Sequence, residues 1–351
     1  MVELTGAKAP PIGEVIPRTV LGIETSCDET AAAVVVGGTD VRSSVVSSQV
    51  ALHSRFGGVV PEIASRAHVE LTNPVVEQAM VEAGVTGADI QIVGATVGPG
   101  LAGALLVGLS AAKALALCWG VPFVAVNHLE AHLHASLLDD PDLELPAVVL
   151  LVSGGHTQIV RMEEIGRYAV VGSTLDDAAG EAFDKVARYL GLGYPGGPAI
   201  DRIATEGDPE AIRFPRAMLG QGLDLSFSGL KTSVVNHVRK NPEVSSADVA
   251  ASFQEAVVDV LVAKARAAAH QFGAKSLCLA GGVAANTRLR ERVLDACMAD
   301  GIDAHLPSRS MCTDNAAMVA AAAHHRFHVD GPSSLSVGAQ PGLALPGVDL
   351  R

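Results

Sequence analysis

The same pattern occurs once in each half of the chain: an apolar strand, then a polar turn, then a second apolar run. Of all the sequence features, this repetition limits the possible folds most strongly. In the first half, an apolar run that starts at Val20 leads into the polar turn 24–30 and a second run that ends at Val36. In the second half, residues 147–152 lead into the turn 153–157. Each pattern predicts a β-hairpin whose tip carries hydroxyls, acids or backbone amides, although an ordinary tight turn is the alternative for either alone.

Three further segments place glycines beside a strand end or a helix start. Residues 277–286 form a buried strand that ends in Gly281-Gly282, residues 97–103 precede a long apolar helix, and residues 193–201 form a glycine-proline loop. Glycine lets the backbone approach a ligand closely, and the start of a helix favours negative charge. No segment has the spacing of a P-loop or a Rossmann motif. A nucleotide-binding site is therefore indicated only by these segments and the hairpin tips taken together.

Two histidines one helical turn apart indicate a metal site. His128 and His132 project from one face of a predicted helix and can bind one divalent ion, whereas His134 points away from that face. A solvated helix face is the alternative, because such pairs also occur by chance. A zincin metalloprotease needs a glutamate directly after the first histidine. Here that residue is Leu129, and Glu130 lies about 100° further round the helix, which argues against a protease.

The composition allows two lobes in a reducing compartment. With 351 residues, 49% hydrophobic and 18% charged, the chain can bury a core for two domains of ordinary size. Its five cysteines form no Cys-x-x-Cys pair and are odd in number, which favours free thiols and a cytoplasmic location. Residues 1–18 contain no apolar signal segment, so we expect a flexible extension and no export.

The apolar stretch 101–126 has the length of a membrane span. Lys113 interrupts its centre, and the sequence Gly-Val-Pro at 120–122 ends the helical pattern. A helix buried between layers fits this pattern better than a helix that faces lipid. We therefore expect no contact with a membrane.

The formal net charge of −13 limits how the chain can bind a nucleic acid. An acidic surface repels a polyanion, so any such contact must be local or assisted by a partner. Two groups of basic residues fit a local patch, and scattered solvated cations are the alternative. The groups are Arg288, Arg290 and Arg292, and Arg55 and Arg66.

Together, the hairpins and the later Gly-Gly loop resemble the duplicated two-lobe α/β fold of actin, the sugar kinases and the heat-shock chaperone ATPase, in which a nucleotide lies in the cleft between the lobes. From about Val20 onward the chain also resembles the tRNA N6-adenosine threonylcarbamoyltransferases, the TsaD family, formerly described as O-sialoglycoprotein endopeptidases. The motifs that carry this resemblance are residues 22–30, 57–68, 98–105, 127–132, 152–157, 176–185, 194–198, 281–286 and 312–315.

The resemblance implies a division of the chain into two lobes. The N-terminal lobe is expected at 19–145, after the flexible extension 1–18, and the C-terminal lobe at 146–314. A helix at about 315–330 is expected to pack back on the N-terminal lobe.

The resemblance also implies that Asp314 joins His128 and His132 as a metal ligand. Two neutral imidazoles and one carboxylate suit iron(II), the ion we expect, or zinc, and leave positions open for substrate oxygens. Without the resemblance, Asp314 would be interpreted as the N-cap of the helix 315–323.

The family's ligand contacts fall on a set of residues in the second half, which implies an adenylate or ATP-type ligand in the cleft. They are Leu151, Val152, Ser153, Gly154, Gly155, Asp184, Gly197, Asp201 and Asn286. The turn 153–155 can approach a phosphate, and Asp184 and Asp201 can accept ribose hydroxyls. For Asp184, an ion pair with Arg188 on the helix surface is the alternative.

The implied reaction transfers a threonylcarbamoyl group from threonylcarbamoyl-adenylate to N6 of an adenosine in the tRNA anticodon loop, at position 37 of tRNAs that read codons beginning with A, and releases AMP. An adenine amine is a poor nucleophile, so a proton acceptor is expected nearby. Glu29 and Asp28 at the first hairpin tip are the candidates.

The resemblance implies partner proteins of the TsaB and TsaE type besides tRNA, and both a monomer and a dimer fit the sequence. Two other classes stay open. A small-molecule kinase or ATPase shares the fold but does not use a paired-histidine metal site. A metalloprotease is opposed by Leu129.

Overall fold

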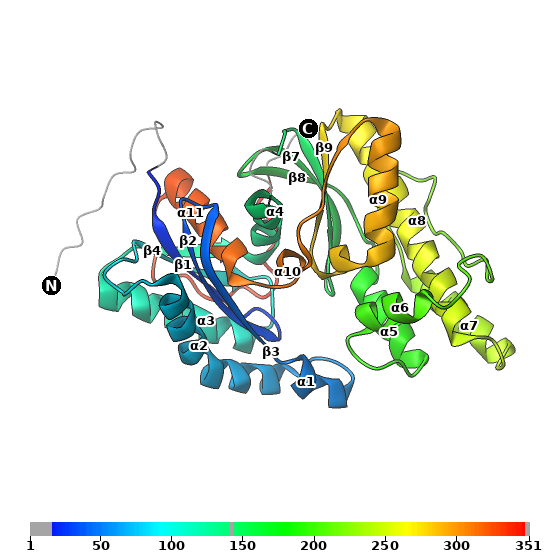
Figure 1. Cartoon of the computed structure of the whole chain (residues 1–351), viewed down its shortest axis with the longest axis horizontal. Coiled ribbons are helices and arrows are strands. Elements are labelled where there is room, and N and C mark those ends of the chain that lie inside the picture. Colours follow the sequence, from blue (N-terminus) through cyan, green and yellow to red (C-terminus); the bar gives the residue numbers. More distant parts are fainter. Residues whose placement is uncertain (1–15, 140–142, 348–351) are drawn as a thin grey trace. The chain divides into compact units, whose positions relative to one another are not determined.

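The computed structural model describes residues 16–139 and 143–347 (Figure 1). These residues form two compact units. The first consists of the described parts of Met1–Ser48, Pro61–His134 and Asn315–Ala344, and the second of the described parts of Gln49–Val60, Ala135–Asp314 and Leu345–Arg351.

These units differ from the predicted lobes at two segments. Residues 49–60, and the described residues 135–139 and 143–145, which we expected in the N-terminal lobe, belong to the second unit. Of the predicted flexible extension 1–18, residues 1–15 lie outside the described residues. Arg18 is described, and its carbonyl oxygen accepts a hydrogen bond from the Gly37 N–H at 3.0 Å.

Each unit is built on one five-stranded mixed sheet. The first sheet has the order β3-β2-β1-β4-β5 and consists of β1 (Thr19–Glu24), β2 (Glu29–Val36), β3 (Asp40–Ser48), β4 (Ile92–Gly98) and β5 (Phe123–Asn127). The second has the order β10-β9-β6-β7-β8 and consists of β6 (Ala147–Val152), β7 (Thr157–Glu164), β8 (Arg167–Ser173), β9 (Ser276–Ala280) and β10 (Asp303–His305).

The two sheets have the same topology. In each sheet the first three strands pair antiparallel in sequence order. The fourth strand pairs in parallel with the first, and the fifth pairs in parallel with the fourth. The predicted hairpins are β1–β2 and β6–β7, with Glu24 opposite Ala31 and Val152 opposite Thr157. The central strands β1 and β6 are buried over nearly all of their length, as is typical of strands covered on both faces. The structure thus confirms the predicted duplicated α/β fold.

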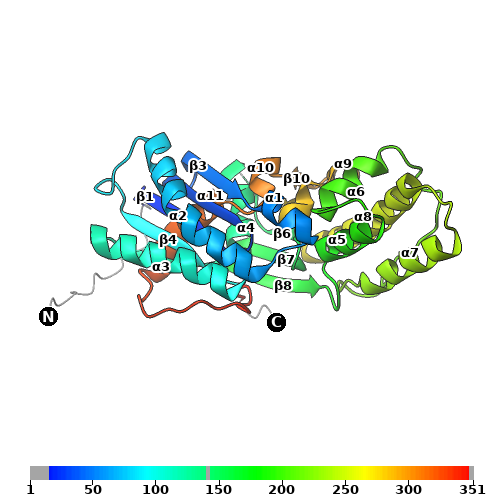
Figure 2. The same cartoon turned by 90° about the horizontal axis from the view of Figure 1, so that it is seen from below.

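Helices cover both faces of the first sheet. Helices α2 (Pro61–Ala83) and α3 (Ala102–Trp119) lie on one face, and α11 (Ala316–Asp330) lies on the other, against β1 and β4 (Figures 1 and 2). Helix α4 (His128–Asp139) follows directly after β5. The chain therefore returns to the first unit with α11 after it has formed the second.

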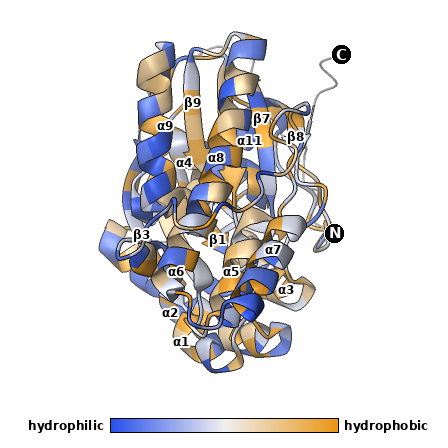
Figure 3. Cartoon of the chain, turned by 90° about the vertical axis from the view of Figure 1, so that its right-hand side faces the viewer, coloured by the Kyte–Doolittle hydropathy of each residue, from blue (hydrophilic) through white to orange (hydrophobic). Residues whose placement is uncertain are grey.

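The second unit contains the remaining helices. They are α1 (Val50–His53), η1 (Ser54–Phe56), α5 (Ala179–Tyr189), α6 (Gly196–Ala204), α7 (Ser228–Lys240), α8 (Ser246–Phe272), η2 (Gly282–Ala285), α9 (Thr287–Asp300) and α10 (Arg309–Cys312). Helix α8 packs against β6 and β7 and carries much of the apolar core. Figure 3 shows hydrophobic residues on β9 and hydrophilic residues along α9.

Helix α3 differs from the prediction in its burial. The helix ends at Trp119, as the Gly-Val-Pro sequence predicted, but it is not enclosed between two layers. One face, which includes Leu105 and Leu109, is buried, whereas Leu106 and Leu117 are exposed. Composition could not show this, because alanine and leucine occupy both faces. Among the described helices, α3 alone has the length and hydropathy of a membrane span, which is weak evidence because a packed helix passes the same test.

Glycines in the first sheet let α11 lie directly against it. A Cβ atom at Gly22 would lie 2.4 Å from the Ala316 carbonyl oxygen and 2.7 Å from the Ala320 nitrogen. A Cβ at Gly94 would lie 2.5 Å from the Ala323 Cβ. The backbone of α11 therefore occupies the space that larger residues in β1 and β4 would fill.

We expect the substitution Gly22→Ala to destabilise the protein by about 1–3 kcal/mol, because the new methyl group must displace the α11 backbone. Gly229→Ala in α7 is the control, because a Cβ there meets no atom within 4 Å. That control should be neutral or stabilising by up to about 1 kcal/mol. Urea unfolding followed by circular dichroism measures both values, and equal effects of the two substitutions would contradict the close packing.

A buried histidine of α11 makes the stability depend on pH. Burial, followed by the neighbouring His328, lowers the pKa of His324 from 6.5 to about 4. The side chain is 4% exposed, and its ring centroid lies 4.5 Å from that of His328. The unfolded chain therefore binds a proton more readily than the folded chain between pH 6.5 and 4. Stability from this group is complete above pH 6.5 and decreases as the pH falls to about 4.

We expect the wild-type protein to lose about 3 kcal/mol through His324 between pH 7 and pH 4. His324→Leu should remove this part of the pH dependence. The half-buried His237 of the second unit provides the control variant His237→Leu, because it removes a histidine outside the His324–His328 pair. Urea midpoints at pH 7, 5.5 and 4.5 measure the effect, and parallel curves for wild type and His324→Leu would refute it.

Candidate active site and metal centre

The two histidines of the predicted pair lie in the first two turns of α4. The Asn127 side-chain oxygen accepts hydrogen bonds from the N–H groups of Leu129 (2.9 Å) and Glu130 (3.2 Å), which fixes the start of the helix at His128. Because His132 follows four residues later, the two rings meet on one face, with centroids 4.7 Å apart. His132 is fully buried, and His128 is 9% exposed.

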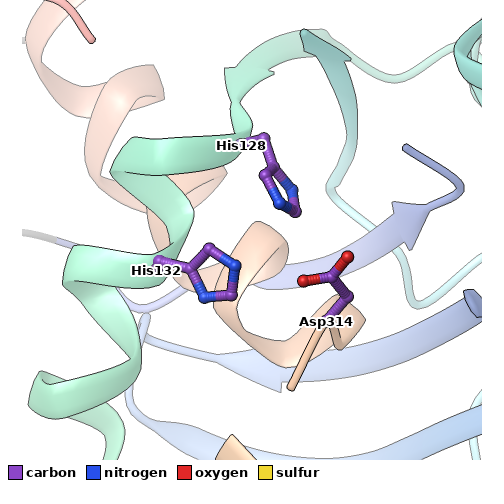
Figure 4. Close-up of side chains that lie close together, drawn as sticks. All are labelled: His128, His132 and Asp314. Carbon is purple, nitrogen blue, oxygen red and sulfur yellow. The ribbon is translucent and has the colours of Figure 1, made fainter. Parts of the chain in front are cut away.

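Asp314 lies beside both histidines, although 182 residues (314 − 132) separate it from His132 in the sequence. One donor atom from each of His128, His132 and Asp314 lies within 4.8 Å of the others. The three side chains point toward one another (Figure 4). Asp314 is not the N-cap of α11, because Asn315 has that role and accepts a hydrogen bond from the Met318 N–H at 3.0 Å. The donor set and its spacing fit one divalent ion.

A buried carboxylate that the sequence analysis missed orients His128. Glu24, at the end of β1, is fully buried, and its Oε2 atom lies 3.0 Å from His128 Nδ1. The same oxygen accepts a hydrogen bond from the Thr96 hydroxyl at 2.6 Å, and Oε1 accepts one from the Ser26 N–H at 2.5 Å. A carboxylate on Nδ1 favours the tautomer with the proton on that nitrogen, which leaves Nε2 as the metal donor. Its position at a strand end was the only signal in the sequence.

Glu130 cannot serve as a protease base, as the sequence analysis argued. It is 1% exposed and forms an ion pair with Arg326 of α11, with Nε 2.9 Å and Nη2 2.8 Å from its carboxylate. This pair joins α4 to α11. The carboxylate of Glu130 is therefore bound to Arg326, whereas the corresponding carboxylate of a zincin faces a water molecule.

The candidate proton acceptors lie where the turn after β1 meets β2, because Asp28 ends the turn and Glu29 is the first residue of β2. Asp28 is 7% exposed, and Glu29 accepts a hydrogen bond from the Ser48 hydroxyl at 3.1 Å. Neither belongs to the His128–His132–Asp314 cluster. His68 bridges the same turn, because it bonds to Thr30 Oγ1 at 2.8 Å and to the Cys27 carbonyl oxygen at 3.0 Å. Their role in proton transfer stays a prediction.

The predicted ligand residues at the end of β6 lie against a glycine loop of the same unit. Leu151 and Val152 are buried strand residues, whereas Gly154 and Gly155 are exposed in the turn that follows. A Cβ at Gly281, which has φ +85°, would lie 2.5 Å from the Val152 carbonyl oxygen. The structure thus brings the turn 153–155 together with the Gly281-Gly282 segment.

The two predicted ribose acceptors already hold neighbouring segments in place. Asp184 accepts a hydrogen bond from the Gly196 N–H at 2.7 Å, next to Gly197. Asp201 accepts one from Asn286 Nδ2 at 3.1 Å, and two from the N–H and hydroxyl of Thr287. The structure therefore groups Asp184 with Gly197 and Asp201 with Asn286.

The alternative partner of Asp184 is engaged elsewhere. The Arg188 guanidinium donates a hydrogen bond to the Gly57 carbonyl oxygen.

Another acid of the 176–185 motif holds two helices together. Asp177 forms ion pairs with Lys185 of α5 and Lys231 of α7, each at 3.0 Å. Burial alone raises the pKa of Asp177, but the hydrogen bonds from the two lysines outweigh it and lower the pKa below its usual value. This aspartate is therefore ionised and has a structural role.

The comparisons with known proteins agree on one family. The family description "TsaD: tRNA N6-adenosine threonylcarbamoyltransferase" matches residues 40–321. Relatives with that name include one from Clostridium perfringens (strain SM101), 51% identical over 333 residues that cover 93% of this chain and 98% of the relative. Another, from Pelobacter propionicus, is 54% identical over 323 residues, which cover 91% and 95%.

Solved structures with low sequence identity share the fold. The (R)-2-hydroxyglutaryl-CoA dehydratase component A of Acidaminococcus fermentans is 13% identical, with a TM-score of 0.55, and the match covers 88% of this chain and 98% of that one. Full-length HypF is 14% identical, with a TM-score of 0.60, over 90% of this chain and 47% of that one. These matches support the fold class alone.

We expect Glu24→Gln to lower the affinity of the His128–His132–Asp314 cluster for Zn²⁺ by about 10- to 100-fold, because an amide cannot accept all three hydrogen bonds that the carboxylate accepts. Thr96→Val is the control, because it removes a hydrogen bond to the same oxygen and leaves the contact with His128. Competition with a zinc chelator measures the affinity, and a Glu24→Gln variant that binds zinc like wild type would exclude the orienting role.

Proposed function

This chain belongs to the family of tRNA N6-adenosine threonylcarbamoyltransferases, and on that basis we propose how its residues carry out the reaction. The protein is an enzyme that transfers a threonylcarbamoyl group to N6 of an adenosine in tRNA. The relatives do not favour a kinase, an ATPase or a metalloprotease. The observation that carries the proposal is the cluster of His128, His132 and Asp314.

We propose that this cluster holds one divalent ion, iron(II) first and zinc second. The family is metal-dependent, and the cluster offers two imidazole nitrogens and one carboxylate at suitable spacing. When bound, such an ion polarises a carbonyl oxygen and stabilises the negative charge that develops on it. The carboxylate of Glu24 would hold His128 in the orientation that binding requires.

The proposed donor is threonylcarbamoyl-adenylate, and the adenosine lies in the anticodon loop at position 37. N6 forms a bond to the carbamoyl carbon, the bond from that carbon to the phosphate oxygen breaks, and AMP leaves. Glu29 or Asp28 accepts the proton that N6 loses. A loop adenosine is unpaired, so the enzyme can reach it at less cost than a base in a duplex.

The proposed nucleotide contacts come from the second unit. The exposed glycines of the turn 153–155 leave room for a phosphate, and a carboxylate has about four acceptor positions, so Asp184 and Asp201 can each accept a ribose hydroxyl beside their present hydrogen bonds. Leu151 and Val152 support the turn from the end of β6. Gly197 and Asn286 complete the set at the adenine-ribose end.

We also propose partner proteins of the TsaB and TsaE type, which supply the activated intermediate in the cytoplasm. Two leucines on the exposed face of α3, Leu106 (52% exposed) and Leu117 (63%), support a protein partner on this helix. A second copy of the chain is the alternative occupant. The acidic net charge supports assistance with tRNA binding.

We expect His128→Ala and His132→Ala to lower threonylcarbamoyl transfer by roughly a hundredfold or more, together with the loss of bound metal, because each removes a ligand. The exposed His270 provides the control His270→Ala. The assay combines purified protein, threonylcarbamoyl-adenylate, unmodified tRNA and partner proteins, and it detects threonylcarbamoyladenosine in digested tRNA. Chelation should abolish transfer, and iron(II) or zinc should restore it. Undiminished transfer by the metal-free protein would exclude the metal proposal.

A further inference from the structure

A groove on the second unit is lined by basic side chains that the reaction above does not use. Its volume is about 1200 Å³, and it lies between α8, α9 and the loop that leads to α7. The cations that line it are Arg213, Arg216, Arg266, Arg288 and Arg292. Three acids line it, namely Glu210, Glu255 and Asp259, and two more beside it, Glu291 and Asp300, pair with Arg288 and Arg266.

Three of these arginines share two carboxylates. Glu255 pairs with Arg288, with Nε at 2.7 Å, and with Arg292. Asp259 pairs with Arg216 at 2.9 Å and with Arg292 at 3.1 Å. Each guanidinium has five N–H donors in a planar fork, so these pairs leave donors that can face an anion. The ion pairs also hold the arginines in fixed positions along the groove.

A fourth arginine has no anionic partner among the described residues. Arg213 is exposed and forms no ion pair or hydrogen bond within the described part of the chain. Arg266, the fifth, pairs with Asp300 at 2.6 Å. The groove therefore combines fixed, partly neutralised guanidinium groups with one cation that is available to a ligand.

We propose that this groove binds the phosphate backbone of the tRNA substrate. Guanidinium groups bind phosphate oxygens in pairs, and a row of them matches a repeating anion. The volume exceeds the usual range of a small-molecule site, about 300–1,000 Å³, which favours a stretch of polymer. The acidic surface elsewhere would repel the same polyanion, so a groove lined by fixed guanidinium donors, with Arg213 as its unpaired cation, gives both attachment and orientation. The proposal rests on tRNA being the substrate.

The groove revises the basic patch predicted from the sequence. Arg288 and Arg292 line it, but Arg290 does not, because its guanidinium donates hydrogen bonds to the carbonyl oxygens of Ala284 and Pro307. Residues from a distant loop, Arg213 and Arg216, complete the patch. The other predicted patch, Arg55 and Arg66, lies outside this groove.

The test compares Arg213→Glu and Arg292→Gln with Arg167→Glu, which makes the same charge change as the first variant on an exposed arginine of the same unit. In the transfer assay with partner proteins, Arg213→Glu should raise the KM for tRNA roughly tenfold, with unchanged kcat and unchanged KM for threonylcarbamoyl-adenylate. The slope of log affinity against log salt should decrease by about 1. Arg292→Gln should act in the same direction, and Arg167→Glu should change the KM less than about twofold.

An unchanged tRNA KM in both groove variants would overturn the proposal. If these variants lost binding of a partner protein while the tRNA KM stayed unchanged, the occupant of the groove would be an acidic protein segment. If the wild type transfers no threonylcarbamoyl group, the proposed function fails by itself. Fluorescence anisotropy with labelled tRNA then tests the groove directly, because weaker binding by Arg213→Glu than by Arg167→Glu supports it and equal binding refutes it.

Discussion

The geometry of the metal cluster depends on the close packing of α11 against the first sheet. Gly22 and Gly94 leave the space in which the α11 backbone lies, and the buried ion pair between Arg326 and Glu130 joins the same helix to α4. Asp314 directly precedes the N-cap of α11, so the contacts that fix the helix also fix this carboxylate. The two histidines are fixed in turn by the start of α4. One packing contact thus brings together ligands that lie far apart in the sequence.

The end of β1 and the turn that follows it form a network of buried polar groups. A charge is stable in a protein interior only when donors surround it, and Glu24 has three of them. These hydrogen bonds connect β1 to Thr96 in β4 and to His128 in α4. The network restricts the ring of His128 before any ligand binds, which is the preorganisation that a catalytic site requires.

The sequence predicted the features that depend on local chemistry. Turn residues between apolar runs predicted both hairpins, and a spacing of four residues predicted that His128 and His132 share a face. Asp314 came from the family resemblance alone, because no periodicity links residues 182 positions apart (314 − 132). Glu24 was missed because an acid at a strand end has the same sequence signature whether it is buried or exposed. The one-sided burial of α3 and the ion pairs that organise the arginine groove depend on tertiary neighbours, which composition does not show.

The return of α11 to the first unit has a consequence for biosynthesis. A ribosome releases the strands of the first sheet early, but the helix that covers one of its faces comes from the last part of the chain, after the whole second unit. Most of the second unit, in contrast, is continuous from residue 135 to residue 314 and can fold as soon as that stretch has emerged. The first sheet therefore stays uncovered on one face for most of translation, and an uncovered apolar sheet face is prone to aggregation until α11 emerges.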